Sequence, residues 1–245
     1  MKRALIAVLA VLVFIVVLCV HLPAAWVLPA LRTQLRCGEV EGTVWHAECT
    51  HALVHGIALD QLTWHVHAAA LLRGRLTMQV HALRHGASAS GELSLPWRGP
   101  LSARNVFARL RVEPAILPVV PAYISGTIEA HLERALIARD GAIEHLRGRI
   151  TLLHLIDSSG EVTPLGSYTV TFPGGAGEPI GQLHDLGTGP LALRGTLRLT
   201  SAPGYVLQAE LAPRASASTS LLQALQYLGP PDDSGRRPFA LQGTY

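Results

Sequence analysis

Most of the chain alternates apolar and polar residues with a period of two, as expected for strands buried on one face only. From Leu76 to Ala82 the apolar residues take one face, and Arg75 begins the series on the other. No helical segment of the length needed for a parallel crossover separates these runs, so the pattern predicts a large antiparallel sheet with one apolar and one polar face. Similar alternation occurs in Thr63–Ala68, Leu101–Val112, Ile124–Leu132, Leu193–Thr200 and Tyr205–Leu211.

A short unit of glycine, a polar residue and an apolar residue recurs through these runs. Gly42-Thr43-Val44 and Gly74-Arg75-Leu76 are two examples, and the uneven spacing excludes a solenoid of fixed repeat length. Glycine inside a strand marks a bend, a bulge or a close backbone approach. The unit therefore favours a strongly curled sheet. The alternative is chance recurrence in a glycine-rich chain.

One short helix is predicted near the C-terminus, between Ser216 and Gly229. Its leucines recur at helical spacing, Ser218 or Ser220 suits the N-cap, and Gly229 suits the stop. The glycine-rich region 173–189 is predicted to be a loop. Residues 232–235 lack the alternating ligands and closing glutamate of a calcium loop, so they are predicted to form a turn.

The N-terminus predicts a membrane anchor. Lys2 and Arg3 precede an apolar run that continues from Ala4 toward Leu28, with Trp26 near its end. A helix of that length spans the hydrocarbon layer of a bilayer, which is about 30 Å thick. Basic residues stay on the cytoplasmic side. The chain is therefore expected to be a single-pass inner-membrane protein, with a cytoplasmic N-terminus and a periplasmic C-terminal domain.

A cleaved signal peptide is the competing interpretation of the same segment. Pro23-Ala24-Ala25 offers small residues near a cleavage point. The apolar run, however, is longer than the roughly 7–15 residues of a signal-peptide core. Both interpretations export the body of the protein. The predicted domains are a cytoplasmic tip and transmembrane anchor at 1–28, a linker at 29–36, and a periplasmic β-rich domain at 37–245.

Cysteine use and charge restrict the function classes. Cys37 and Cys49 are the only cysteine pair in the exported part, and an oxidising compartment permits a disulfide between them, with two free thiols as the alternative. Their spacing is not that of a zinc site. The formal net charge is +3 with no basic cluster, which argues against nucleic acid as a partner.

No catalytic motif stands out, so the chain is predicted not to be an enzyme and to need no cofactor. His65 and His67 lie two apart on a predicted strand and point to one face, which is the geometry of a nascent zinc or copper site. No carboxylate or cysteine of matching spacing completes it. A solvated polar face is the favoured interpretation, and no metal site is predicted.

Several segments, taken in order, resemble the type II secretion system protein N family (general secretion pathway protein N). Val40–Trp45 resembles its Gly-Thr-x-Trp element, through Gly42 and Trp45. Ala47 stands where the family often has glycine. The other matching segments are Leu22–Val27, Leu62–His65 with Trp64, Leu71–Leu76 with Gly74, and Leu228-Gly229 followed by Gly235–Phe239 and Gly243.

The resemblance implies a non-catalytic accessory component of the machine that moves folded periplasmic proteins through an outer-membrane secretin. Its expected partners are the inner membrane and other type II secretion components, with the secretin as a candidate. Gly42, Trp45, Trp64, Gly74 and Gly235 are expected to determine the fold or an interaction surface. Exposed strand edges would supply protein contacts by strand addition. The alternative is a lipid-binding or lipid-transfer groove, with phospholipid as ligand, formed by the apolar sheet face.

Overall fold

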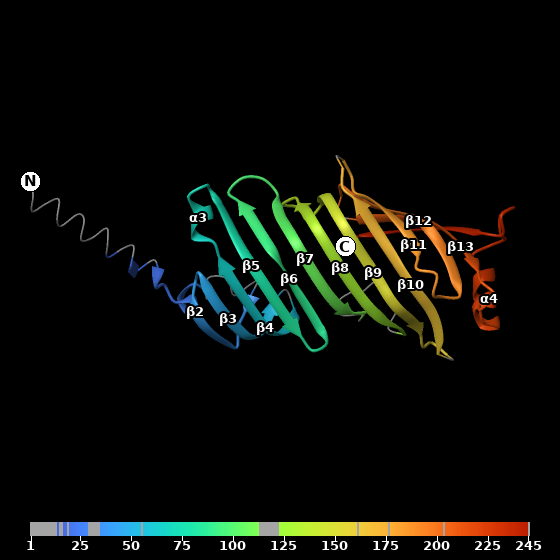
Figure 1. Ribbon diagram of the computed structural model, residues 1–245, viewed down its shortest axis with the longest axis horizontal. Helices are drawn as coiled ribbons and strands as arrows, with labels where there is room; N and C mark the ends of the chain where they lie inside the picture. Colours follow the sequence, from blue (N-terminus) through green and yellow to red (C-terminus); the bar gives the residue numbers. More distant parts are fainter. Residues whose placement is uncertain are drawn as a thin grey trace, which may run out of the picture. The chain divides into compact units, whose positions relative to one another are not determined.

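The fold comes from a computed structural model that describes residues 14, 17–18, 20–28, 35–54, 56–112, 123–160, 162–175, 177–202 and 204–244. The chain divides into two compact units, Met1–His85 and Gly86–Tyr245. Each unit is mainly an antiparallel sheet, coloured blue to cyan in unit 1 and green to red in unit 2 (Figure 1). The mainly β, antiparallel fold predicted from period-two alternation is confirmed.

Unit 1 combines short helical turns with a small sheet. Its strand order is β1-β3-β4-β5, and β2 pairs with the other part of β3. Each pair is antiparallel, as expected for strands joined by short turns. The elements are α2 (Ala24–Val27), β1 (Leu35–Arg36), β2 (Glu39–Thr43), β3 (His46–Val54), β4 (Ile57–Val66), α3 (Ala68–Leu71) and β5 (Arg75–Arg84).

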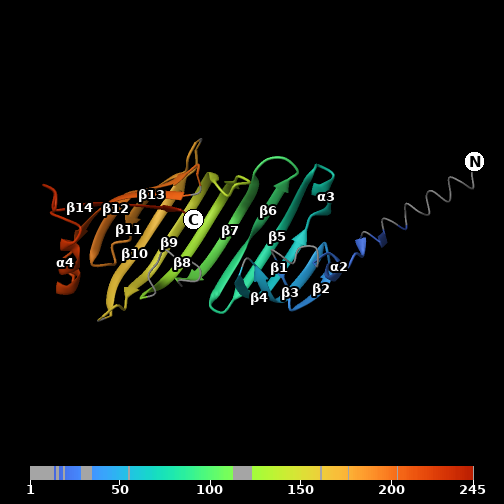
Figure 2. The same cartoon turned by 180° about the vertical axis from the view of Figure 1, so that it is seen from behind.

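Unit 2 is a meander in which the strands from β6 to β14 follow one another in chain order. Seen from behind, its strands again lie side by side in sequence (Figure 2). The elements are β6 (Ala87–Pro96), β7 (Leu101–Arg111), β8 (Ile124–Ile137), β9 (Ile143–Asp157), β10 (Thr163–Pro173), β11 (Ile180–Asp185), β12 (Leu191–Thr200), β13 (Gly204–Pro213), α4 (Thr219–Gln226) and β14 (Arg237–Thr244).

The sheet of unit 2 is not closed into a barrel. Within the described residues, β14 pairs with β13 and with no further strand, so its outer edge is unpaired. The register shifts at several points along β8, β9 and β10, where an extra residue is accommodated in one strand. Asn105 and His154 adopt positive φ in β7 and β9, as residues in bulges do.

The helix predicted near the C-terminus is confirmed as α4, the element between β13 and β14. Ser218 is its N-cap, and its hydroxyl oxygen accepts a hydrogen bond from the Leu221 amide at 3.3 Å. Gly229 follows the helix with a φ of +95°, a conformation that glycine adopts at no steric cost. Leu225 is the buried residue of the helix.

The loop predicted over residues 173–189 is wrong in part, because Ile180–Asp185 forms strand β11. The segment shows no clear alternation, because Ile180 and Leu183 fall on opposite faces of a strand and glycines and prolines surround it. Pairing with β10 on one side and β12 on the other defines it as a strand. Tertiary pairing here outweighs the weak local preference of the residues.

The membrane anchor predicted over residues 1–28 falls largely outside the described residues. In the part of the chain that is described, no helix is both long and apolar enough to cross a membrane. The boundaries predicted at residues 28 and 36 stay predictions.

Candidate functional site

The apolar face of the unit 2 sheet runs across its strands in register. Val170 of β10 pairs with Ile150 of β9 on one side and with Leu183 of β11 on the other. Leu183 pairs in turn with Gly195 of β12, which pairs with Ala209 of β13. Because residues directly opposite each other in a sheet share a face, these residues form one continuous apolar surface.

The residues at the centre of this surface are buried against one another. Phe172 is only 2% exposed, and Ala103 of β7 belongs to the same buried cluster as Ala209 of β13. Strand β10 also approaches β12 across the intervening β11. A flat sheet would leave such residues open to water, so the sheet of unit 2 bends about its apolar face.

Two glycines permit this bend by removing side chains from the crowded face. A Cβ atom on Gly181 would lie 2.8 Å from Cε1 of Phe172, and one on Gly195 would lie 2.6 Å from Cβ of Ala209. Both distances are far inside van der Waals contact. Glycine at these positions therefore reflects close packing of the curved face rather than a turn.

At the outer strand of unit 2, apolar side chains reach solvent. Leu241 of β14 is 54% exposed, and it pairs with Leu207, which packs against the buried cluster. The unpaired edge of β14 thus borders apolar surface. Unpaired backbone N–H and C=O groups beside apolar side chains form a site to which another chain can add a strand.

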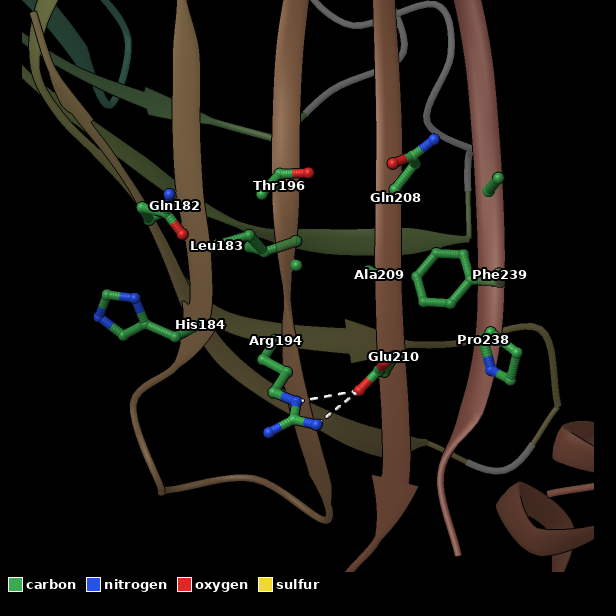
Figure 3. A pocket seen from close by; sticks show the side chains of 12 residues that line it. Gln182, Leu183, His184, Arg194, Thr196, Gln208, Ala209, Glu210, Pro238 and Phe239 are labelled. Carbon is green, nitrogen blue, oxygen red and sulfur yellow. Dashed lines mark hydrogen bonds and ion pairs between the residues drawn. The ribbon is translucent and has the colours of Figure 1, made fainter. Parts of the chain in front are cut away.

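Strands β11 to β14 also line a hollow, in which polar side chains occur together with Leu183, Ala209 and Phe239. The hollow has a volume of about 990 Å³ and is lined by Gln182, His184 and Gln208, among others. Arg194 of β12 donates from Nε and Nη2 to one carboxylate oxygen of Glu210 on β13, as Figure 3 shows. Both side chains are exposed, at 62% and 39%, so the pair contributes little to stability.

A second ion pair lies at the end of β11 and is better shielded. Arg214 donates to Asp185, whose side chain is only 14% exposed, and also to the carbonyl oxygens of Gly189 at 3.0 Å and Leu191 at 2.8 Å. Asp185 in turn accepts from the amides of Gly187 and Leu193, each at 2.8 Å. Asp185 and Arg214 therefore fasten the β11–β12 turn to the end of β13.

The surroundings of Asp185 and Tyr168 shift their pKa values in opposite directions. Burial alone would raise the pKa of Asp185, but the hydrogen bonds from Arg214, Leu193 and Gly187 outweigh it and lower the pKa. Burial, reinforced by the charge of Asp185, raises the pKa of Tyr168 to about 12. Tyr168 instead donates its hydroxyl proton to the Leu165 carbonyl at 2.6 Å. The side chains of Asp185 and Tyr168 both have hydrogen-bond partners within the fold, which indicates a structural role.

Unit 1 contains a separate apolar pocket with a volume of about 410 Å³. Trp45 and Trp64, both singled out from the sequence, line it together with Val27 of α2, Leu71 of α3 and Met78 of β5. Every side chain in its lining is apolar. The indole N–H of Trp64 donates to the Val44 carbonyl at 3.1 Å, so the polar atom of this ring is occupied within the protein.

The structure places the three predicted glycines in two different settings. Gly42 has a φ of +101°, and a Cβ there would collide with the carbonyl oxygen of His46. Gly74 has a φ of +68° with no atom within 4 Å of where a Cβ would be. Gly235 has a φ of +75° in the turn after Asp232. Gly42 is thus fixed by its backbone and by packing, whereas Gly74 and Gly235 are fixed by backbone conformation alone.

Cys37 and Cys49 are joined by a disulfide in unit 1, with their Cα atoms 5.6 Å apart. Cys49 lies on β3 and is fully buried, in a small cluster with Ala52 and Leu62. The bridge links this cluster to the segment between β1 and β2. Its formation in the cell stays a prediction.

Three histidines of unit 1 lie close together, on β3, on β4 and directly after β4. Nδ1 of His46 lies 3.3 Å from Nδ1 of His65, and the ring centroids of His65 and His67 lie 5.3 Å apart. In the residues that the structure describes, no group of three or more histidine, cysteine or carboxylate side chains is arranged to hold a metal ion. Residues 232–235 form the predicted turn, in which Asp232 accepts hydrogen bonds from Ser234 and Arg236.

Sequence reasoning did not find the pairing of Asp185 with Arg214 or the pocket of unit 1. Asp185 and Arg214 are 29 residues apart, and no spacing rule links them. The pocket combines helical turns and strands between residues 24 and 80, and each contributes ordinary apolar residues. Trp45 and Trp64 were the only residues of the pocket lining that stood out in the sequence.

These features define a class: an antiparallel β protein whose large open sheet curls about an apolar face and presents an unpaired edge strand. Residues 33–240 match the family described as Type II secretion system (T2SS), protein N. The chain belongs to that family. The family resemblance inferred from the sequence motifs is therefore confirmed.

Two similar proteins carry the same description, "Type II secretion system protein N". The protein from Vibrio cholerae serotype O1 is 28% identical over 242 residues, covering 91% of this chain and 91% of its own length. The protein from Aeromonas hydrophila is 24% identical over 254 residues, covering 99% of this chain and 98% of its own length. No solved structure matches the chain.

Proposed function

We propose that this chain is a non-catalytic, inner-membrane accessory component of the type II secretion machinery. Its N-terminal segment anchors it with the N-terminus in the cytoplasm, and its β-rich body extends into the periplasm and contacts other secretion components. Membership of the protein N family supports the assignment to the machinery. The basic tip, the apolar run and the Cys37–Cys49 pair support the topology.

The unpaired edge of β14 is the observation that carries the proposed protein contacts. An extended segment of a partner would bond to the free N–H and C=O groups of this edge, and its apolar side chains would pack beside Leu241. The outer-membrane secretin and the inner-membrane secretion proteins are candidate partners. Pro238 lacks an N–H group, so pairing would favour the part of β14 beyond it.

Site-specific photocrosslinking in secreting cells tests this function. A photoreactive residue at Gln242, an exposed position on β14, is expected to give adducts with a secretion protein. The same residue at Arg149, exposed on the central strand β9, serves as the control because β8 and β10 already flank that strand. Equal adduct patterns from both positions would contradict the edge as the contact surface.

The alternative, a lipid-binding groove, is favoured by the continuous apolar face of unit 2. The burial of Phe172 and Ala209 at its centre argues that this face is largely filled by the protein itself. A photoreactive residue at Leu197, which packs against that cluster, distinguishes the two functions. Adducts dominated by phospholipid would support the lipid-binding groove and would contradict a function limited to protein contacts.

A further inference from the structure

The unit 1 pocket differs from the unit 2 face because it is a defined hollow with a lining free of polar side chains. Its volume of about 410 Å³ falls within the range of small-ligand sites. No charged side chain lines it, and the indole N–H of Trp64 is already donated to the Val44 carbonyl. Its occupant must therefore be apolar.

The volume excludes a peptide as the occupant. A helix with its side chains is roughly 10–12 Å wide, so 410 Å³ would hold about one turn or less. An extended peptide would bring backbone N–H and C=O groups into a lining that offers them no partners. A hydrocarbon chain has neither problem. If a methylene takes about the 30 Å³ of a liquid water, the pocket holds roughly a dozen methylenes.

A second hollow adjoins the apolar pocket of unit 1, and one charged residue, Arg36, contributes to its lining. Its volume is about 570 Å³, and it shares Leu28 and Leu35 with the apolar pocket. Arg36 also lines it, and among the described residues no carboxylate lies within ion-pair distance of this guanidinium. An apolar pocket joined to a hollow with an exposed cation matches an amphiphile with one acyl chain and an anionic head group.

Apolar side chains near the pocket are also exposed. Trp26 is 71% exposed and precedes the lining residue Val27, and Leu72 is 92% exposed and follows the lining residue Leu71. Tryptophan is favoured where an apolar phase meets water. These side chains give the pocket a surface on which an amphiphile from a bilayer could enter.

We infer that unit 1 binds one acyl chain of an anionic lipid, with the chain between Trp45, Trp64 and Met78 and the head group beside Arg36. This site goes beyond the proposed protein contacts of β14 and beyond a groove in unit 2, since it is formed by residues of unit 1 alone. The shared chemistry fits a free fatty acid or a phospholipid that inserts one of its chains.

The test uses the full chain in cells fed a fatty acid that carries a diazirine and an alkyne. After illumination, the adducts are mapped by mass spectrometry, and their mass separates free-acid from phospholipid sources. The expected adducts lie on unit 1 peptides containing Trp45, Trp64 or Met78. Adducts restricted to unit 2 strands would overturn the inference while leaving the groove alternative standing.

Matched variants make the test specific. Met78→Trp fills the pocket and is expected to lower the unit 1 adduct on the order of tenfold, because excluding about two methylenes from burial weakens binding by that factor. Gln79→Trp adds the same ring at the next, exposed position of β5 and is expected to leave the adduct unchanged. Equal adduct in both variants would overturn the inference.

A second pair of variants tests the head group. Arg36→Gln is expected to reduce adducts of anionic lipids several-fold, as loss of a charge-assisted contact does. Arg75→Gln, an exposed arginine elsewhere in unit 1, is the control.

If Met78→Trp fails to fold, as judged by loss of the Cys37–Cys49 bridge, Leu76→Gln makes the lining polar without filling it. An unchanged adduct in folded Leu76→Gln contradicts the site, and crosslinking from Gln242 reports separately on the secretion contacts.

Discussion

Arg214 donates to the carboxylate of Asp185 across 29 residues of chain, and the same guanidinium holds the carbonyl oxygens of Gly189 and Leu191. One side chain thereby satisfies a largely buried carboxylate and two backbone groups of the β11–β12 turn. The exposed pair of Arg194 and Glu210, on β12 and β13, has the same chemistry without the burial. The two pairs form an internal comparison.

Arg214→Ala is expected to destabilise unit 2 by about 2–4 kcal/mol, because it leaves Asp185 buried without its cation. Arg194→Ala, the matched control, is expected to cost about 0–1 kcal/mol because its pair is exposed. Urea unfolding of the full chain in mild detergent measures both. Equal losses in the two variants would show that burial does not set the strength of these pairs.

The lowered pKa of Asp185 predicts a specific loss of stability in acid. A carboxyl group whose pKa is lower in the folded state stabilises the fold above its unfolded pKa of about 3.9, and the stabilisation is lost as the pH falls through the folded pKa. The free energy of unfolding should therefore fall below about pH 4. Asp185→Asn should be less stable at neutral pH and show a smaller acid-dependent loss. An unchanged pH dependence in Asp185→Asn would assign the acid sensitivity to other groups.

Gly42 and Gly74 both have positive φ, but they differ in the space around them. Gly74→Ala is expected to cost about 1–2 kcal/mol, the strain of a left-handed backbone alone. Gly42→Ala is expected to cost more, because its Cβ would also collide with the His46 carbonyl oxygen. Thermal unfolding of the two variants ranks the costs. A larger loss in Gly74→Ala would contradict the packing around Gly42.

The Cys37–Cys49 bridge, with a sequence separation of 12, is expected to contribute about 2–3 kcal/mol. The double variant Cys37→Ala with Cys49→Ala should unfold at lower temperature than the oxidised protein. A reducing agent should lower the unfolding temperature of the oxidised protein and leave that of the double variant unchanged. Modification of both cysteines by a thiol reagent in the untreated, denatured protein would show that no bridge forms.

The sequence by itself determined the elements whose signals are local. Alternation from Leu76 to Ala82 gives a strand with one apolar face regardless of its neighbours, because successive side chains point to opposite faces. Ser218 and Gly229 mark the start and stop of α4, because a hydroxyl cap and a left-handed C-terminal glycine act within one turn. The motifs around Trp45 and Trp64 likewise identified the family.

Only the tertiary structure decided which distant residues meet. Residues Ile180–Asp185 form strand β11 because β10 and β12 pair with them. Asp185 contacts Arg214 only when these strands are paired. The pocket behind Trp45 and Trp64 depends on how α2 and α3 lie against the unit 1 sheet. Side-chain period is local, whereas strand register, curvature and cavity shape arise from the combined packing of segments that are far apart in the chain.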